Sequence, residues 1–241
     1  AILLSLLVVL CNVRWTDAFS PLPVSGCRSA PLFLNCVSQI HSPSSVMKPF
    51  HDRTALKIIS GLRNFDPISV SKVVKAANAG GATHIDIACD PELVKMAMSI
   101  TELPICVSSV DPQAFVAAVK AGASMVEIGN YDGFYKEGRT FSADEVLRMT
   151  EQTRLLLGKD IPLSVTVPHT LPLDEQVDLA EKLVTAGASI IQTEGGMPMQ
   201  PSCGGLQGLI EKAAPTLAAT AAISRAVPVP TMAASGISHL T

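Results

Sequence analysis

Charged and aromatic residues are both scarce in this chain of 241 residues. Charged residues make up 16% and aromatic residues 4% of the chain, whereas 48% of the residues are hydrophobic. This composition excludes a disordered or acidic-tail protein. There is no basic run, and 18 basic residues face 21 acidic ones, so nucleic acid is not expected as a partner. The shortage of aromatic side chains favours an α/β interior over a β-sandwich.

The cysteines form no framework, because the sequence has no CxxC, HxH or HExxH pattern. A protein-built zinc site and a disulfide scaffold are therefore not predicted. Cys89, Cys106 and Cys203 are the only cysteines beyond residue 50. Scattered thiols of this kind suit a reducing compartment better than the exterior.

The chain has no apolar run long enough to cross a membrane at its start. Its first ~10 residues are apolar, which is typical of a signal-peptide h-region and short of the ~20 residues of a span. Ala18 before Phe19 offers a cleavage point, and residues 19–50 are free of acid and rich in serine and proline, like a transit peptide. We therefore predict an incomplete signal peptide over 1–18 and a disordered plastid transit peptide over 19–50. Together they would form a bipartite signal that brings a nuclear-encoded protein to the chloroplast stroma. The alternatives are a buried N-terminal helix and a secreted protein with a disordered linker.

From residue 54 onward, strand-like runs alternate with helix-like segments, several of which begin with Asp-Pro, an N-cap acid before a first-turn proline. A repeated pattern marks three junctions between a helix and the next strand: Gly80–Ile87, Ala121–Ile128 and Ala186–Thr193. The predicted strands are Ala55–Ser60, His84–Ala88, Ile105–Ser109, Met125–Gly129, Leu163–Val167, Ile190–Glu194 and Val229–Ala234. The predicted helices are Pro67–Asn78, Pro91–Ser99, Pro112–Lys120, Ser142–Leu157, Leu173–Thr185 and Leu206–Arg225.

This alternation predicts an α/β fold with a parallel sheet, best satisfied by a (β/α)₈ TIM barrel over residues 51–241. Only seven strands are found, so the barrel is expected to be truncated before its eighth strand and to leave an open edge. A doubly wound sheet is the alternative. It would usually show a GxGxxG sequence after its first strand, which is absent.

Alternating strand positions separate an apolar outer set from a polar inner set. In a barrel the outer set faces the helices and the inner set faces the lumen. The inner set contains four ionisable residues: Lys57, Asp86, Glu127 and Glu194. Burying them costs several kcal/mol each unless they pair, and one lysine cannot neutralise three carboxylates. At least one acid is then held protonated or matched by a cation or ligand, which suits proton transfer. The alternative is a structural ion network, and a shift of one residue in register would turn all four outward.

Strand ends supply further candidates. His169 follows the fifth predicted strand and could act as general acid or base, or simply face solvent. Lys57 is favoured as an ion-pair or substrate-orienting group over a Schiff-base amine, because nearby carboxylates oppose the free amine. Glycine-rich strand ends suggest a phosphate site made of Gly195, Gly196, Ser235 and Gly236. No cofactor is evident from the sequence, although Mg²⁺ held by two carboxylates stays open.

Long motifs in this chain resemble the uncharacterised plastid and cyanobacterial family named after hypothetical chloroplast reading frame twenty-three. The resemblance extends from about Thr54 to Thr241. It is carried by Ala55–Gly61, Gly80–Pro91, Leu103–Asp111, Met125–Asp132, Ser164–Thr170 and Gln192–Gly196. It implies an aldolase-type TIM barrel in a plastid or cyanobacterium and no known reaction.

The sequence therefore leads to an enzyme hypothesis of lyase or isomerase type. It would use general acid–base catalysis on a small, phosphorylated metabolite. The alternative is a non-catalytic metabolite-binding or regulatory barrel, and a third reading is an interaction scaffold. The mature protein is not expected to be embedded in a membrane, and the sequence does not indicate an oligomeric state.

Overall fold

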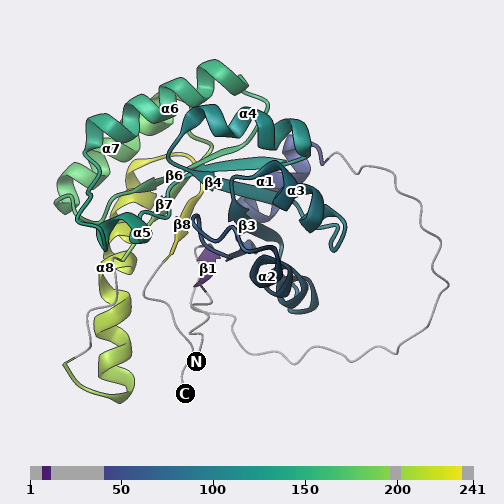
Figure 1. The fold of residues 1–241 in the computed structure, drawn as a ribbon. Coiled ribbons are helices and arrows are strands. Elements are labelled where there is room, and N and C mark those ends of the chain that lie inside the picture. Colours follow the sequence, from purple (N-terminus) through teal and green to yellow (C-terminus); the bar gives the residue numbers. More distant parts are fainter. Residues whose placement is uncertain (1–6, 12–40, 196–201, 235–241) are drawn as a thin grey trace.

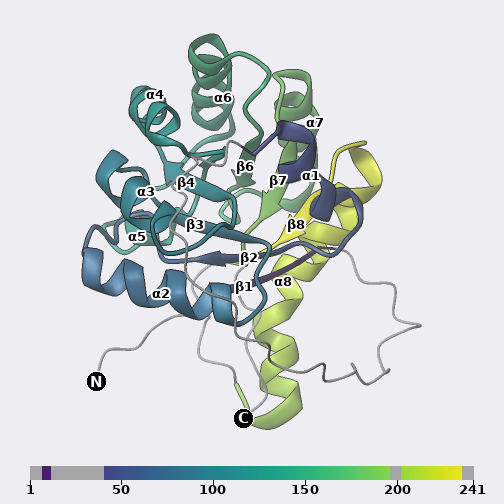
Figure 2. The same ribbon diagram turned by 90° about the vertical axis from the view of Figure 1, so that its right-hand side faces the viewer.

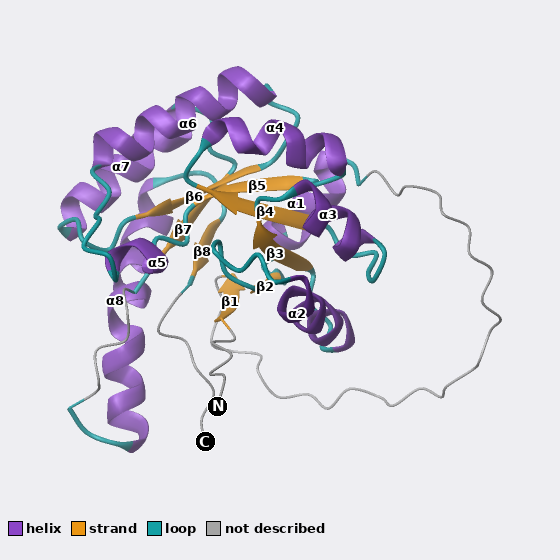
Figure 3. Ribbon diagram, viewed as in Figure 1, coloured by secondary structure: helices purple, strands orange, loops and turns teal. Residues whose placement is uncertain are grey.

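The computed structural model describes residues 7–11, 41–195 and 202–234. At its centre is a barrel-shaped sheet surrounded by helices (Figure 3). Its strands are β1 (Leu7–Cys11), β2 (Leu56–Ile59), β3 (His84–Ala88), β4 (Ile105–Ser109), β5 (Met125–Ile128), β6 (Leu163–Val167), β7 (Ile190–Thr193) and β8 (Thr231–Ala233). Its helices are α1 (Pro43–His51), α2 (Pro67–Ala79), α3 (Pro91–Met98), α4 (Pro112–Ala121), α5 (Asp132–Tyr135), α6 (Ala143–Leu157), α7 (Leu173–Thr185) and α8 (Gly205–Ala226).

Strands β2 to β8 pair in chain order and run parallel to one another. This confirms the seven parallel strands and the α/β barrel predicted from the sequence. Around the sheet, α2, α3, α4, α6, α7 and α8 follow the strands in turn, and the N-terminal half of α8 projects beyond the barrel (Figures 1 and 2). Every predicted strand and helix is present, with ends within a few residues of those expected.

Seven parallel strands lie within the described residues, and β1 takes the place between the last and the first of them. This strand lies antiparallel between β2 and β8 and closes the sheet. The prediction placed residues 1–18 outside the fold and left an open edge, whereas Leu7–Cys11 lie within the sheet. The physical reason is that unpaired edge strands present free backbone donors and acceptors, and an apolar segment of high strand propensity satisfies them.

The expected cap chemistry is present at the helix starts. Asp66 accepts hydrogen bonds from the backbone N–H groups of Ile68 and Ser69, both at 3.1 Å, and Pro67 occupies the first helical position. Asp90 and Asp111 cap α3 and α4 in the same way. An N-cap of this type contributes ~1 kcal/mol. These caps fix where each helix leaves the carboxyl end of its preceding strand.

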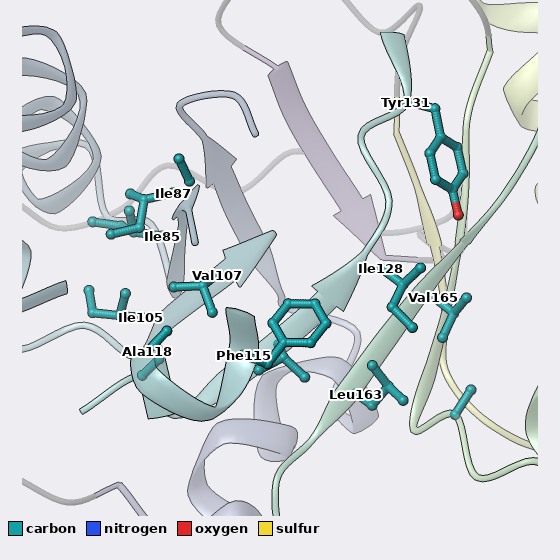
Figure 4. Packing of buried hydrophobic residues seen from close by; sticks show 14 of the residues in the cluster. Ile85, Ile87, Ile105, Val107, Phe115, Ala118, Ile128, Tyr131, Leu163 and Val165 are labelled. Atoms are coloured by element: carbon teal, nitrogen blue, oxygen red, sulfur yellow. The ribbon is translucent and has the colours of Figure 1, made fainter. Parts of the chain in front are cut away.

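Two apolar layers enclose the sheet. The outer layer lies between strands and helices. Figure 4 shows Ile85, Ile87, Val107 and Leu163 from the strands and Phe115 from α4 within it. Within the lumen, a smaller cluster contains Ile59, Cys106, Met125, Ile190 and Met232. The alternation of strand faces therefore follows the predicted register.

Helix α1 closes the barrel at the amino ends of its strands. Val46 and Phe50 from this helix are 0% and 1% exposed and pack on the lumen cluster. The prediction of a disordered segment through residue 50 is therefore wrong for Pro43–Phe50. Lack of acidic residues suggested a transit peptide there, but two apolar residues four apart are enough to seat a short helix on an apolar layer.

His84, the first residue of β3, connects α1 to the sheet. Its Nε2 lies 2.9 Å from the carbonyl oxygen of Val46, and its ring lies 4.6 Å from the ring of Phe50. The carbonyl only accepts, so Nε2 carries the proton. Burial lowers the pKa of His84 to about 4.

Acidification should therefore weaken the contact between His84 and helix α1. The folded-state pKa lies below the ordinary value of ~6.5, so the stabilisation is present above that pH and is lost as pH falls toward 4. We expect a loss on the order of 3 kcal/mol across this window, measured by urea unfolding. A His84→Gln variant should show a flatter profile there. An equal slope in His84→Gln and wild type would contradict the assignment, and the exposed His51→Gln variant serves as the control.

Candidate active site

A buried ion cluster occupies the barrel lumen above its apolar floor. Lys57, Asp86 and Glu127 come from β2, β3 and β5 and are each 0% exposed. The Lys57 Nζ lies 3.0 Å from Oδ2 of Asp86 and also pairs with Oε2 of Glu127. One ammonium group thus bridges the two carboxylates, as the prediction of a shared lumen requires.

Neighbouring polar side chains saturate both carboxylates. Ser108 donates to Oδ1 of Asp86 at 2.6 Å, and Asn130 donates to Ser108 at 2.8 Å. Gln192 donates to Oε1 of Glu127 at 2.8 Å and to the Thr166 hydroxyl at 3.0 Å. Hydrogen-bonded networks of this kind hold charged groups in one arrangement, and in this one Oε1 of Gln192 is buried without a partner.

The charges in this cluster do not cancel, since two carboxylates face one ammonium. Burial raises the pKa of Glu127, an effect that Lys57 partly offsets and Asp86 reinforces. Burial alone would lower the pKa of Lys57, but Asp86 and Glu127 outweigh it and raise that pKa above its ordinary value. Lys57 is therefore an ammonium ion, and Glu127 is the group most ready to exchange a proton.

Glu194 does not join this cluster, contrary to the expectation that four ionisable residues would share one lumen. It follows β7 and is 5% exposed. Its Oε1 accepts from the backbone N–H of His169 at 3.0 Å and lies 2.9 Å from Nδ1 of the same residue. Tyr135 donates its hydroxyl to the same oxygen. Among the hydrogen bonds of the described residues, none connects Glu194 to Lys57.

His169 follows β6, and the contact with Glu194 places it at the carboxyl ends of the strands, as predicted. Its pKa is raised by the hydrogen bond to Glu194, which outweighs the opposing effect of burial. The side chain is 28% exposed, so the ring is accessible. The site thus has two parts, the lumen cluster of Lys57, Asp86 and Glu127 and the mouth pair of His169 and Glu194.

Tyr135 is the site residue that the sequence did not reveal. It lies on α5, a four-residue helix after β5 that the strand–helix pattern treats as a loop. Its ring meets the His169 ring edge to face at 4.8 Å. The run Asn130–Asp132 at the end of β5 is the nearest signal in the sequence, and it stops short of Tyr135.

The predicted phosphate residues lie at the edge of what the structure describes. Gly195 follows Glu194 and is partly buried. Gly196, Ser235 and Gly236 lie outside the described residues. The phosphate site therefore stays a prediction.

A metal ion could be held by the lumen cluster. Asp86, Cys106 and Glu127 offer ligand atoms that all lie within 4.8 Å of one another. Lys57 Nζ already contacts both carboxylates, and burial raises the pKa of the Cys106 thiol well above its ordinary value. The two carboxylates are therefore already paired with the Lys57 ammonium, and the Cys106 thiol holds its proton. A metal ion would have to displace the ammonium to bind here.

Gly129 permits the close packing of β5 against β6 beside the cluster. A Cβ atom at this position would lie 2.0 Å from Oγ1 of Thr166, the hydroxyl to which Gln192 donates. We expect Gly129→Ala to lower the free energy of unfolding by about 1–3 kcal/mol through overpacking, measured by urea unfolding. Gly204→Ala is the matched control, because no heavy atom lies within 4 Å of its added Cβ. Equal stability of the two variants would contradict this packing.

Comparisons with known proteins match this chain over most of the described barrel. The model of the family described as "Protein of unknown function (DUF561)" matches residues 40–241. The protein named ycf23 from Pyropia yezoensis is 40% identical over 198 residues, which are 82% of this chain and 72% of that protein. The ycf23 protein from Cyanophora paradoxa is 45% identical over 187 residues, 77% of this chain and 76% of its own length.

Among solved structures, the chain is similar to one titled "QR15, an Aldolase". The match has 18% identity and a TM-score of 0.44, and it covers 68% of this chain and 75% of that chain. At this score the likeness supports no inference about activity.

Within the described residues, no helix is long and apolar enough to cross a membrane. The family match covers most of the chain, and its start at residue 40 agrees with a folded region that includes α1. On these matches, the chain belongs to the DUF561 family, together with the algal proteins named ycf23.

Proposed function

We propose that this protein is an enzyme that uses general acid–base chemistry of lyase or isomerase type on a small, phosphorylated metabolite. One observation carries the proposal: an uncompensated ion cluster of Lys57, Asp86 and Glu127 is fully buried in the lumen. Burying such charges is costly, and apolar side chains of similar volume would stabilise the barrel at least as well. A lumen is ordinarily filled by valine, isoleucine and leucine. The cost therefore supports a chemical role.

Each group has a role that follows from its protonation state. Glu127, whose raised pKa favours the acid form, would donate a proton to the substrate or return one. The Lys57 ammonium would stabilise negative charge that develops on a substrate oxygen, and Asp86 would hold the ammonium in place. A Schiff base at Lys57 is disfavoured because its raised pKa removes the free amine. His169 at the mouth would exchange the second proton.

A phosphate group would lie at the mouth and not beside Asp86 and Glu127 in the lumen. Gly195 follows Glu194 directly, and the predicted partners Gly196, Ser235 and Gly236 complete the proposed site. Backbone N–H groups at glycines suit phosphate oxygens. Mg²⁺ is the ion to test in the lumen, because carboxylates are its preferred protein ligands. It would have to displace the Lys57 ammonium.

A thermal-shift screen with phosphorylated metabolites, with and without Mg²⁺, tests this proposal. A ligand at 100 times its Kd should add about 2.7 kcal/mol of stability. We expect a hit among phosphorylated compounds. A folded protein that responds to none of them would contradict the phosphate assignment. A tight ligand that is never turned over would instead support the alternative, a metabolite-binding or regulatory barrel. If the protein binds a partner and still binds it after the lumen charges are neutralised by substitution, the hypothesis of an interaction scaffold would be favoured.

The relatives' name, ycf23, denotes a chloroplast reading frame, which supports a plastid location. Residues ahead of α1 would then serve as the bipartite targeting sequence of a nuclear-encoded protein. Helix α1 starts at Pro43, so this sequence would end before that residue. Removal after Ala18 would also remove β1. N-terminal sequencing of the protein isolated from plastids tests this: a mature start between residues 19 and 42 is expected, and retention of Leu7–Cys11 would contradict cleavage.

A further inference from the structure

The short helix α5 lies across the mouth of the barrel. It follows β5, and its contacts reach the segments after three other strands. Arg63, in the segment after β2, donates to the carbonyl oxygen of Gly133 at 3.2 Å. Tyr135 contacts His169 after β6 and Glu194 after β7. The helix therefore joins the β2–α2 segment to the mouth pair.

Arg63 clamps α5 at both ends. Besides its bond to Gly133, it pairs with Glu137 just beyond the helix, and its guanidinium lies 5.6 Å from the centre of the Phe134 ring. The approach is close, since a Cβ atom on Gly133 would lie 3.0 Å from Cδ of Arg63. A planar guanidinium can make these contacts together, whereas an exposed ion pair alone would contribute little.

At the C-terminal end of α5, Tyr135 fixes the acceptor that orients His169. Oε1 of Glu194 receives the Tyr135 hydroxyl and faces Nδ1 of His169 at 2.9 Å. A carboxylate facing Nδ1 requires a proton on that nitrogen. In the neutral ring Nε2 is then the basic atom, and it has no hydrogen-bond partner among the described residues. The titratable groups that face His169 are Glu194, Asp132 and Tyr135.

We propose that Arg63 and Tyr135 are positioning residues, which act through α5 and Glu194 to hold His169 in the Nδ1–H tautomer with Nε2 available to substrate. The inference relies on the proposed function only for the use that His169 makes of Nε2. Within the described part of the chain, Arg63 donates to Gly133 and Glu137 and to neither His169 nor Glu194, so any influence on the ring must pass through α5.

The two residues should therefore have the same effect on His169. Without the Tyr135 hydroxyl, Oε1 of Glu194 loses one donor and becomes a stronger acceptor for the imidazolium. The titration midpoint of His169 should rise by about 0.5–1 pH unit, since one hydrogen bond is worth about 1 kcal/mol. Loss of the Arg63 clamp should free Tyr135 and produce the same rise.

Nitrogen-15 NMR of the imidazole ring measures both properties in the full chain. The variants are Tyr135→Phe, Arg63→Met and the double variant, and His169→Gln assigns the signal. In wild type the neutral ring should carry its proton on Nδ1. Each single variant should raise the midpoint, and the double variant should raise it no further than either one, because both act on one contact. Lys136→Met is the control: it removes a positive charge beside α5 and leaves the Arg63 contacts intact.

Three results would overturn the inference. The neutral ring of wild type could carry its proton on Nε2. Arg63→Met could leave the midpoint at its wild-type value or move it only as far as Lys136→Met does. The shifts of the two single variants could also add in the double variant. By contrast, a protein with the predicted tautomer that never turns a ligand over would contradict the proposed function and leave the positioning roles intact.

Discussion

Replacing Lys57 with methionine should lower the free energy of unfolding by about 3–5 kcal/mol. The substitution keeps the length of the side chain and removes the ammonium that bridges Asp86 and Glu127. Two buried carboxylates then face one another without a cation. Removing one partner of a buried pair leaves an uncompensated charge, which is far more costly than the loss of an exposed pair. Urea unfolding at neutral pH measures this change.

The pH dependence distinguishes the lost charge from a packing defect. In wild type the folded-state pKa of Lys57 is raised, so its contribution is present below ~10.4 and lost only at higher pH. In Lys57→Met one carboxyl must take up a proton, so the variant should recover stability as pH falls. Lys95→Met, which breaks the exposed pair with Glu92, should cost less than about 1 kcal/mol. A Lys57→Met protein as stable as Lys95→Met would refute the bridging role.

Replacing Glu127 with glutamine should preserve the fold and remove activity. The glutamine carbonyl oxygen can still accept from Lys57, and its NH₂ group can donate to Oε1 of Gln192 once the Gln192 amide turns over. The cluster then holds one ammonium and one carboxylate. Turnover of the ligand found by thermal shift should fall by about 10²–10⁴-fold, the usual contribution of a general acid or base. The control is Glu181→Gln on the outer face of α7, which should keep full activity.

Stability should change in the opposite direction to activity. The folded-state pKa of Glu127 is raised above its ordinary value of ~4.3, so the folded protein holds this proton longer than the unfolded chain. Wild-type stability should therefore fall as pH rises through that window, and Glu127→Gln should not show this fall. Above the window the variant should equal or exceed wild type. A variant that is both active and less stable would show that Glu127 serves the structure.

The inward or outward direction of each strand residue was predictable, because apolar and polar residues alternate along the barrel strands. Lys57, Asp86 and Glu127 are flanked by aliphatic residues that can face only the helices, so the sequence fixes which side each charge takes. The register was right for this reason, because a slip of one residue would have turned the aliphatic side chains into the lumen and the charges toward the helices. The Asp-Pro caps located the helix starts for an equally local reason.

The contacts across the lumen and the mouth could not be read from the sequence. Whether Lys57 reaches Glu127 or Glu194 depends on strand tilt and rotamers, and no spacing along the chain encodes them. Tyr135 was missed because α5, with four residues, is too short for a helical period to repeat. Helix α1 and strand β1 were missed because their composition resembles that of targeting segments, while tertiary packing decides their structure.

Solvent hydrogen exchange into a bound ligand tests the central claim, that the lumen cluster moves protons, most directly. The ligand identified by thermal shift would be incubated in D₂O with wild type, Glu127→Gln and Glu181→Gln, and its carbon-bound hydrogens followed by proton NMR. The account predicts deuterium incorporation with wild type and Glu181→Gln, and at least ~10²-fold slower incorporation with Glu127→Gln. A ligand that binds wild type but neither exchanges nor reacts, or that exchanges equally fast with Glu127→Gln, would contradict it.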